Sequence, residues 1–130
     1  MLQNVIFIDD DIPTNIVNKR LAMRSNCFKD IKFYKSSKEA IAHLRSFSSV
    51  TDFPDLIFLD INMPVMNGWQ FLDQLKTIYQ FETIKIVMLS TALNVTEAEE
   101  MKYADVISAY ENKPLTINKI KAHTNYLDAM

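Results

Sequence analysis

The sequence predicts an α/β fold, a doubly wound five-stranded parallel sheet of (βα)5 organisation, and three observations carry this prediction. Short apolar runs alternate with amphipathic stretches of helical period along the whole chain of 130 residues. The first, third and fourth apolar runs are nearly continuous, as in strands that are covered on both faces. No repeat or low-complexity segment interrupts the alternation. Regular alternation of this kind favours a parallel sheet with helices on both of its faces.

The apolar runs define the expected strands. They lie at Val5–Ile8, Ile31–Tyr34, Leu56–Leu59, Ile84–Leu89 and Val106–Tyr110. Apolar residues at helical spacing indicate the helices between the strands. These residues are Ile16, Val17 and Leu21 in the first helix, Ala40, Ile41 and Leu44 in the second, Phe71, Leu72, Leu75, Ile78 and Tyr79 in the third, and Ile117, Ile120 and Leu127 in the last. The fourth helix, around residues 96–103, has the weakest apolar face.

Capping residues support the helix boundaries. Ser36 with Glu39, and Thr96 with Glu99, have the spacing of a capping box. Asp11 is most simply a helix N-cap. We therefore expect helices to begin just after residues 11, 36 and 96.

Composition excludes several classes of function. A formal net charge of -2 argues against a general polyanion binder, so we expect no nucleic-acid partner. No apolar run approaches the roughly 20 residues that span a bilayer, and no basic stretch precedes the first strand, as a secretory signal would require. Cys27 is the only cysteine, which excludes an intrachain disulfide and fits a reducing cytoplasm. Gly68 is the only glycine, so neither a P-loop nor a dinucleotide fingerprint can exist. We expect a single domain over residues 1–130, without an output domain.

Polar residues follow the expected strands at the points where they end. They are Asp9, Asp10 and Asp11 after the first strand, Asp60 and Asn62 after the third, Ser90 and Thr91 after the fourth, and Lys113 after the fifth. Ligand sites of open parallel sheets form outside these carboxyl ends. Neighbouring carboxylates cannot all stay ionised without a cation, which suggests a metal, and carboxylates with phosphate oxygens suit Mg²⁺. A lysine and a hydroxyl could then hold a phosphoryl group, with Asp60 as the nucleophile.

Four sequence motifs, each at a strand end and in chain order, carry a resemblance. They are Phe7-Ile8-Asp9-Asp10-Asp11, Leu59-Asp60-Ile61-Asn62-Met63-Pro64 with Gly68 after it, Leu89-Ser90-Thr91-Ala92, and Tyr110-Glu111-Asn112-Lys113-Pro114. Over nearly its whole length the chain resembles the receiver domains of two-component response regulators. The resemblance implies the flavodoxin-like receiver fold with strand order 2-1-3-4-5.

The resemblance also implies a chemistry. Asp60 would accept a phosphoryl group from a sensor histidine kinase or a histidine phosphotransfer protein. Mg²⁺ would be held by Asp10, Asp60 and the backbone carbonyl of Asn62, with Asp9 helping through water. The domain would assist its own phosphorylation and dephosphorylation without being a turnover enzyme.

Three further residues receive roles from the resemblance. Ser90 would hydrogen-bond the phosphoryl group, Lys113 would form an ion pair with it, and Tyr110 would be an aromatic switch that moves with Ser90. A one-residue shift would exchange Ser90 with Thr91. A downstream protein would bind through the fourth helix, fifth strand and fifth helix, and we expect a monomer or weak homodimer.

Two other functions stay open at this stage. The Asp9–Asp11 run also resembles the opening motif of haloacid-dehalogenase-type phosphatases, with Asp9 as the nucleophile. Pro13 stands where that motif expects Thr or Val, and the prominence of Asp60 would go unexplained. The second alternative is a degenerate receiver that acts as a binding module. His43 and His123, without a paired acid in sequence, are expected to be surface histidines.

Overall fold

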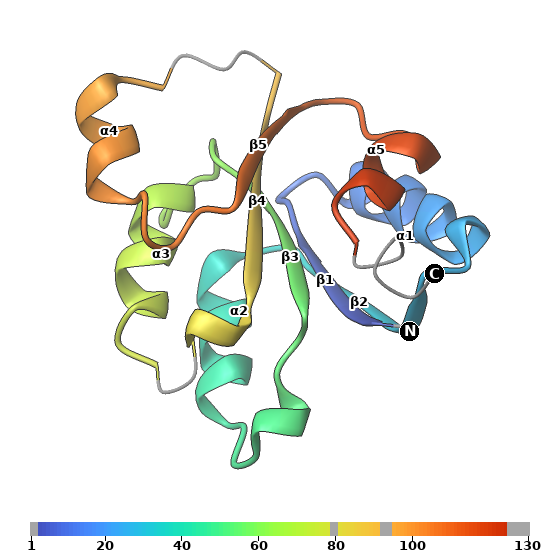
Figure 1. Cartoon of the computed structure of the whole chain (residues 1–130), viewed down its shortest axis with the longest axis horizontal. Coiled ribbons are helices and arrows are strands. Elements are labelled where there is room, and N and C mark those ends of the chain that lie inside the picture. Colours follow the sequence, from blue (N-terminus) through green and yellow to red (C-terminus); the bar gives the residue numbers. More distant parts are fainter. Residues whose placement is uncertain (1–2, 79–80, 92–94, 125–130) are drawn as a thin grey trace.

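The predicted alternation of strands and helices is present in the computed structural model, which describes residues 3–78, 81–91 and 95–124 (Figure 1). The strands are β1 (Gln3–Ile8), β2 (Phe28–Tyr34), β3 (Leu56–Asp60), β4 (Lys85–Ser90) and β5 (Ala109–Asn112). The helices are α1 (Ile12–Ser25), α2 (Ser37–Arg45), α3 (Gly68–Leu75), α4 (Glu97–Lys102) and α5 (Ile117–Ala122). All strand pairs are parallel, and the order is β2-β1-β3-β4-β5, which confirms the predicted fold class.

The sheet separates two layers of helices. Helices α1 and α5 pack together on one face, and α2, α3 and α4 lie on the other (Figure 1). Successive side chains of a strand point to opposite faces. In β1, Val5 and Phe7 accordingly pack on the α1/α5 side, while Ile6 and Ile8 belong to the opposite core. This double covering explains why β1, β3 and β4 are apolar in continuous runs.

Helix α1 buries a different face from the one predicted. Ile16 and Val17 were expected to mark its core stripe, but they are exposed by 41% and 52%. The buried side chains are Asn15, Asn18, Ala22 and Ser25. The reason is local: the Asn15 side-chain amide donates to the backbone carbonyls of Asp9 and Tyr34 at 2.7 Å and 3.4 Å. These hydrogen bonds turn the polar Asn15 face of α1 toward the sheet, and Ile16 and Val17 point to solvent instead.

Helix caps follow the prediction closely. Asp11 caps α1 by accepting the Thr14 N–H, and Ser36 caps α2 by accepting the Glu39 N–H. A reciprocal capping box is present at α4, between Thr96 and Glu99. A second capping box, between Asn67 and Gln70 at α3, was not predicted.

The last strand begins later than predicted. The run Val106–Tyr110 was expected to form it, but β5 covers Ala109–Asn112 and pairs with β4 from Val87 onward. Val106 lies in the turn after α4, where its N–H donates to the Tyr103 carbonyl and its side chain is buried in the core. Because Val106 is apolar and buried although it lies in a turn, the prediction placed the start of the strand three residues too early.

Two residues assigned to helical stripes, Tyr79 and Leu127, lie outside the described residues. Within the described ranges, no helix has the length and apolar character needed to span a bilayer.

Candidate functional site

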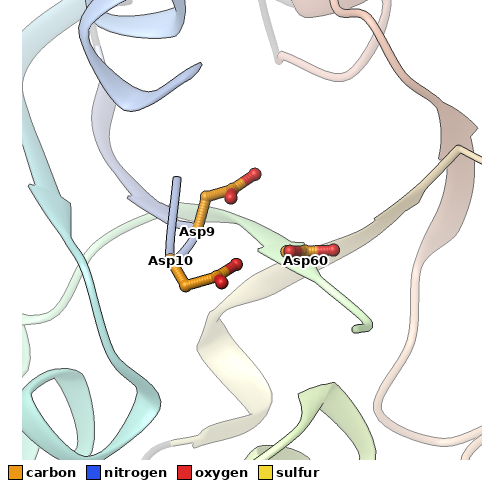
Figure 2. Close-up of side chains that lie close together, drawn as sticks. All are labelled: Asp9, Asp10 and Asp60. Carbon is orange, nitrogen blue, oxygen red and sulfur yellow. The ribbon is translucent and has the colours of Figure 1, made fainter. Parts of the chain in front are cut away.

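Three carboxylates meet at the carboxyl edge of the sheet because β1 and β3 are hydrogen-bonded neighbours. Ile8 pairs with Leu59, so the residues that follow them also lie side by side. Asp9, Asp10 and Asp60 each place a carboxylate oxygen within 4.8 Å of the others (Figure 2). Asp9 and Asp60 are only 2% and 4% exposed, while Asp10 is exposed to solvent. The structure thus brings together the acidic residues that the strand ends predicted.

Lys113 reaches this cluster from the turn after β5. Its Nζ lies 2.6 Å from Asp9 Oδ2 and 3.4 Å from Asp60 Oδ2. Its backbone N–H donates to the Ser90 carbonyl at 2.9 Å, which aligns the turn with the end of β4. Burial lowers the pKa of Lys113, but the hydrogen bond to Asp9 and the charges of Asp60 and Asp9 outweigh burial and raise it. The side chain therefore stays an ammonium near neutral pH.

The carboxyl group of Asp60 is unusually hard to ionise. Burial, and then the negative charge of Asp9, raise its pKa from 3.8 to about 6, although Lys113 and the Asn62 N–H act in the opposite direction. The Asn62 N–H donates to Asp60 Oδ1 at 3.2 Å. Because the charge of the Asp9 carboxylate contributes to the raised pKa of Asp60, a cation bound between the two carboxylates would lower that pKa again. The donor set, all carboxylate oxygens with one of them exposed, fits a hard divalent cation.

Asp9 is held in place by two hydrogen bonds from the start of α1. Its Oδ1 accepts the Asp11 N–H at 2.9 Å, and its carbonyl accepts from Asn15 at 2.7 Å. Asn15 is fully buried and was missed by the sequence reasoning. Its only sequence signal was an amide about one helical turn after the end of the acidic run, and apolar periodicity takes no account of such a residue.

Ser90 and Thr91 occupy different environments. Ser90 is the last residue of β4, pairs with Asn112 of β5 and is 1% exposed. Thr91 is exposed and lines an open, mainly apolar groove of about 420 Å³ together with Val17, Lys113 and Leu115. Ser90 is thus the hydroxyl at the strand end, as predicted from the sequence, while Thr91 lies on the rim beyond it. Ala92 lies outside the described residues.

The loop from β3 to α3 folds back onto the end of β3. The Gly68 N–H donates to the Ile61 carbonyl at 2.8 Å. A Cβ at position 68 would lie 2.9 Å from Ile61 Cα and 3.0 Å from the Asp60 carbonyl oxygen. Only glycine lets the start of α3 come this close to the backbone of Asp60 and Ile61, and Gly68 is the single glycine of the chain.

Tyr110 is the second residue of β5 and is half-buried. It lines a groove of about 240 Å³ with Glu100, Ala104 and Ile107. Burial, followed by the charges of Glu100 and Glu99, raises the pKa of its phenol. Tyr110 therefore lies in β5 at the groove beside α4, on the surface that the resemblance predicts for a downstream partner.

Both histidines make side-chain contacts that the sequence did not reveal. His43 is half-buried against Tyr34 and Phe47. His123 Nε2 lies 2.7 Å from Glu111 Oε2, so the prediction of a surface histidine without a paired acid was wrong for His123.

Comparison with known proteins identifies the family. The model of the response regulator receiver domain matches residues 5–125. Two-component response regulator 24 of Arabidopsis thaliana is 30% identical over 115 residues, which are 88% of this chain and 76% of that protein. A probable C4-dicarboxylate response regulator, DctR, of Halalkalibacterium halodurans is 27% identical over 129 residues. The match covers 99% of this chain but 53% of that regulator, so the chain spans about half of its length.

Solved structures agree with these relatives. A two-component response regulator from Cytophaga hutchinsonii superposes with a TM-score of 0.84 at 28% identity, covering 98% of this chain and 97% of that one. A CheY-like receiver domain protein from Methanospirillum hungatei superposes with a TM-score of 0.74 at 27% identity, covering 95% and 92% of the two chains. A family match over most of the chain, the shared fold and the acidic cluster at the sheet edge lead to one conclusion: this chain belongs to the response regulator receiver domain family of two-component systems.

Proposed function

We propose that Asp60 is the phosphoacceptor of this receiver domain. The observation that carries the proposal is its position. Asp60 ends the central strand β3, with the carboxylates of Asp9 and Asp10 within 4.8 Å and the Lys113 ammonium at 3.4 Å. Lys113 lies closer still to Asp9, at 2.6 Å, so the place of Asp60 at the end of the central strand is what singles it out.

The transfer itself needs one nucleophile and one leaving group. An Asp60 oxygen attacks the phosphorus of a phosphohistidine on a sensor kinase or phosphotransfer protein. A P–O bond forms, the P–N bond breaks, and its electron pair stays on the imidazole nitrogen of the donor. The product is an aspartyl phosphate. Asp60 must be ionised to attack, and its pKa of about 6 allows this at neutral pH.

Mg²⁺ would be held by Asp10, Asp60 and the Asn62 carbonyl, with Asp9 contributing through water. When bound, Mg²⁺ supplies positive charge that offsets the phosphoryl oxygens in the transition state. The Lys113 ammonium provides a second positive charge, and Ser90 provides a hydroxyl at the end of the adjacent strand. Burial shields Asp9 and Asp60 from bulk solvent, which strengthens these charge interactions.

Phosphorylation would act as a switch rather than as a step of turnover. Tyr110 and α4 provide the readout, because Tyr110 lines a groove with Glu100 of α4 and belongs to β5, the strand that leads to Lys113. A downstream protein would bind the surface of α4, β5 and α5. Helix α4 can change its position at little cost in packing when Asp60 is phosphorylated, since none of its residues is buried. A cytoplasmic location stays a prediction from the sequence.

Acid-stable, base-labile labelling tests the acceptor. Purified protein is incubated with Mg²⁺ and acetyl phosphate, and the phosphoprotein is quantified by mass spectrometry. We expect one phosphoryl group per chain, lost in Asp60→Asn and preserved in Asp30→Asn, an exposed aspartate of β2. Label that survives Asp60→Asn but disappears with Asp9→Asn would overturn the proposal in favour of a phosphatase-type nucleophile. No label from acetyl phosphate or a cognate kinase would instead identify a binding module.

A further inference from the structure

A second lysine is bound to the turn that carries Lys113. Lys119, in α5, places its Nζ 3.0 Å from the Asn112 carbonyl oxygen and 3.1 Å from the Pro114 carbonyl oxygen. These two carbonyls flank Lys113 on either side in the chain. The Lys119 ammonium therefore donates to the backbone immediately before and immediately after the residue that contacts Asp9 and Asp60.

Lys119 is itself held from two directions. Its backbone N–H donates to the hydroxyl of Thr116, the N-cap of α5, at 3.1 Å. Its Nζ lies 3.8 Å from Glu111 Oε1, and the other Glu111 oxygen lies 2.7 Å from His123 Nε2. A carboxylate can only accept, so the His123 ring donates through Nε2. The side chains of Lys119, Glu111 and His123 are 33%, 22% and 13% exposed, so the cluster lies partly within the protein.

The chemistry of an ammonium suits this arrangement. A lysine ammonium has three N–H donors, and here two of them meet carbonyl oxygens while the third is available to Glu111. Pro114 has no N–H of its own to tie the turn back to the protein. The turn is instead anchored through the Lys113 N–H at the Ser90 carbonyl and through the carbonyls that Lys119 binds.

We propose that Lys119 is a positioning residue for phosphoryl transfer. By holding the Asn112 and Pro114 carbonyls, it sets the direction in which Lys113 leaves the backbone, and so places the Lys113 ammonium at the acceptor. The proposal rests on the function proposed above, since it assigns the geometry of the same site. Glu111 and His123 orient Lys119 and act one step further away.

Four single variants and one double variant test this role. Lys119→Met keeps most of the aliphatic side chain but removes the donors, and Lys119→Arg keeps the charge and restores donors. Lys29→Met, an exposed lysine near the amino end of β2, is the matched control. Lys113→Ala, alone and combined with Lys119→Met, completes a double-mutant cycle. The readouts are the initial rate of labelling by acetyl phosphate and Mg²⁺, and hydrogen exchange of the Lys113 amide.

We expect Lys119→Met to slow labelling by about threefold to tenfold, as for a modest displacement of a catalytic group. Exchange of the Lys113 amide should quicken by a similar factor, with the thermal unfolding midpoint little changed. Lys119→Arg should recover most of the rate, and Lys29→Met should match the wild type. In the Lys113→Ala background, Lys119→Met should have no further effect, because its only route to the reaction is through Lys113.

Other outcomes would overturn the proposal. Wild-type labelling and exchange in a folded Lys119→Met protein would show that the two carbonyl contacts position nothing. Additive losses in the double variant would show that Lys119 acts elsewhere. Failure of the wild-type protein to take label would overturn the proposed function, whereas exchange of the Lys113 amide still decides whether Lys119 holds the turn.

Discussion

Asp60 carries a charge that its surroundings oppose. Burial removes water from its carboxylate, Asp9 adds a second negative charge, and the pKa rises to about 6. In the unfolded chain the same group titrates near 3.8. Because the folded pKa is the higher one, Asp60 contributes stability at low pH, and this contribution is lost as the pH rises through about 6. The metal-free fold at neutral pH therefore tolerates a destabilised carboxylate at the proposed phosphoacceptor.

This leads to a prediction for Asp60→Asn. Without metal, at about pH 7, the substitution should raise the free energy of unfolding by about 1–3 kcal/mol, because it removes the charge that burial penalises. The gain should shrink as the pH falls toward about 4, where the folded wild type is already protonated. Urea denaturation in chelator measures both values. Asp30→Asn is the control, and a metal-free Asp60→Asn protein no more stable than wild type would contradict the prediction.

At the level of elements, the β3–α3 loop is the most constrained connection to the site. Gly68 brings the start of α3 against Ile61 and the Asp60 carbonyl. Between them Val65 has a positive φ of 68°, and the Met66 N–H donates across it to the Pro64 carbonyl at 2.7 Å. Such a three-residue turn is strained, and a β-branched residue increases the strain. The geometry of the loop therefore requires glycine at position 68, whereas it strains the backbone of Val65.

Gly68→Ala should lower the free energy of unfolding by about 1–3 kcal/mol, because the added Cβ meets backbone that cannot rotate away. The same displacement should slow labelling of Asp60, since the affected carbonyl belongs to Asp60 itself. Urea denaturation and the acetyl phosphate assay measure the two effects.

Val65→Gly is the matched substitution in the same loop. Val65 is 80% exposed, so its removal costs little packing. Relief of the positive φ should leave stability unchanged or raise it by up to about 1 kcal/mol. Loss of stability in Val65→Gly as large as in Gly68→Ala would show that the loop tolerates no change at all, and that the Cβ contact at position 68 is not the cause.

On the scale of the whole molecule, the site joins segments that are distant in sequence. Asp9 and Asp10 follow β1, Asp60 ends β3, and Lys113 follows β5. Helices cover both faces of the sheet that joins these strands (Figure 1). A cation bound by the carboxylates would therefore link the first and third strands and stabilise the fold as a whole.

Magnesium should accordingly raise the thermal unfolding midpoint of the wild-type protein. At a Mg²⁺ concentration of about tenfold the dissociation constant, the free energy of unfolding should rise by about 1.4 kcal/mol. Differential scanning calorimetry over a Mg²⁺ titration measures it. Asp10→Asn should weaken the response, while Asp30→Asn should leave it intact. A wild-type midpoint that does not depend on Mg²⁺ would contradict a metal site at these carboxylates.

Prediction from sequence succeeded for the places of residues that end a strand or follow one. Asp9, Asp60, Ser90 and Lys113 were located because each stands at or just beyond the end of an apolar run, and parallel strands share one carboxyl edge. It failed at Val106, where an apolar residue that is buried in a turn resembles one in a strand. It also failed at the buried face of α1, where a buried amide replaced the apolar stripe.

The sequence by itself determined the order of strands and helices, the acidic, hydroxyl and lysine groups at the strand ends, and the exclusion of glycine-rich phosphate loops. These follow from periodicity and composition, which are local properties of the chain. Only the tertiary structure decided that Asn15 fixes Asp9, that Asp9 raises the pKa of Asp60, and that Lys119 binds the turn of Lys113. Each of these depends on distances between atoms from different elements, and such distances exist only once the sheet and its helices have packed.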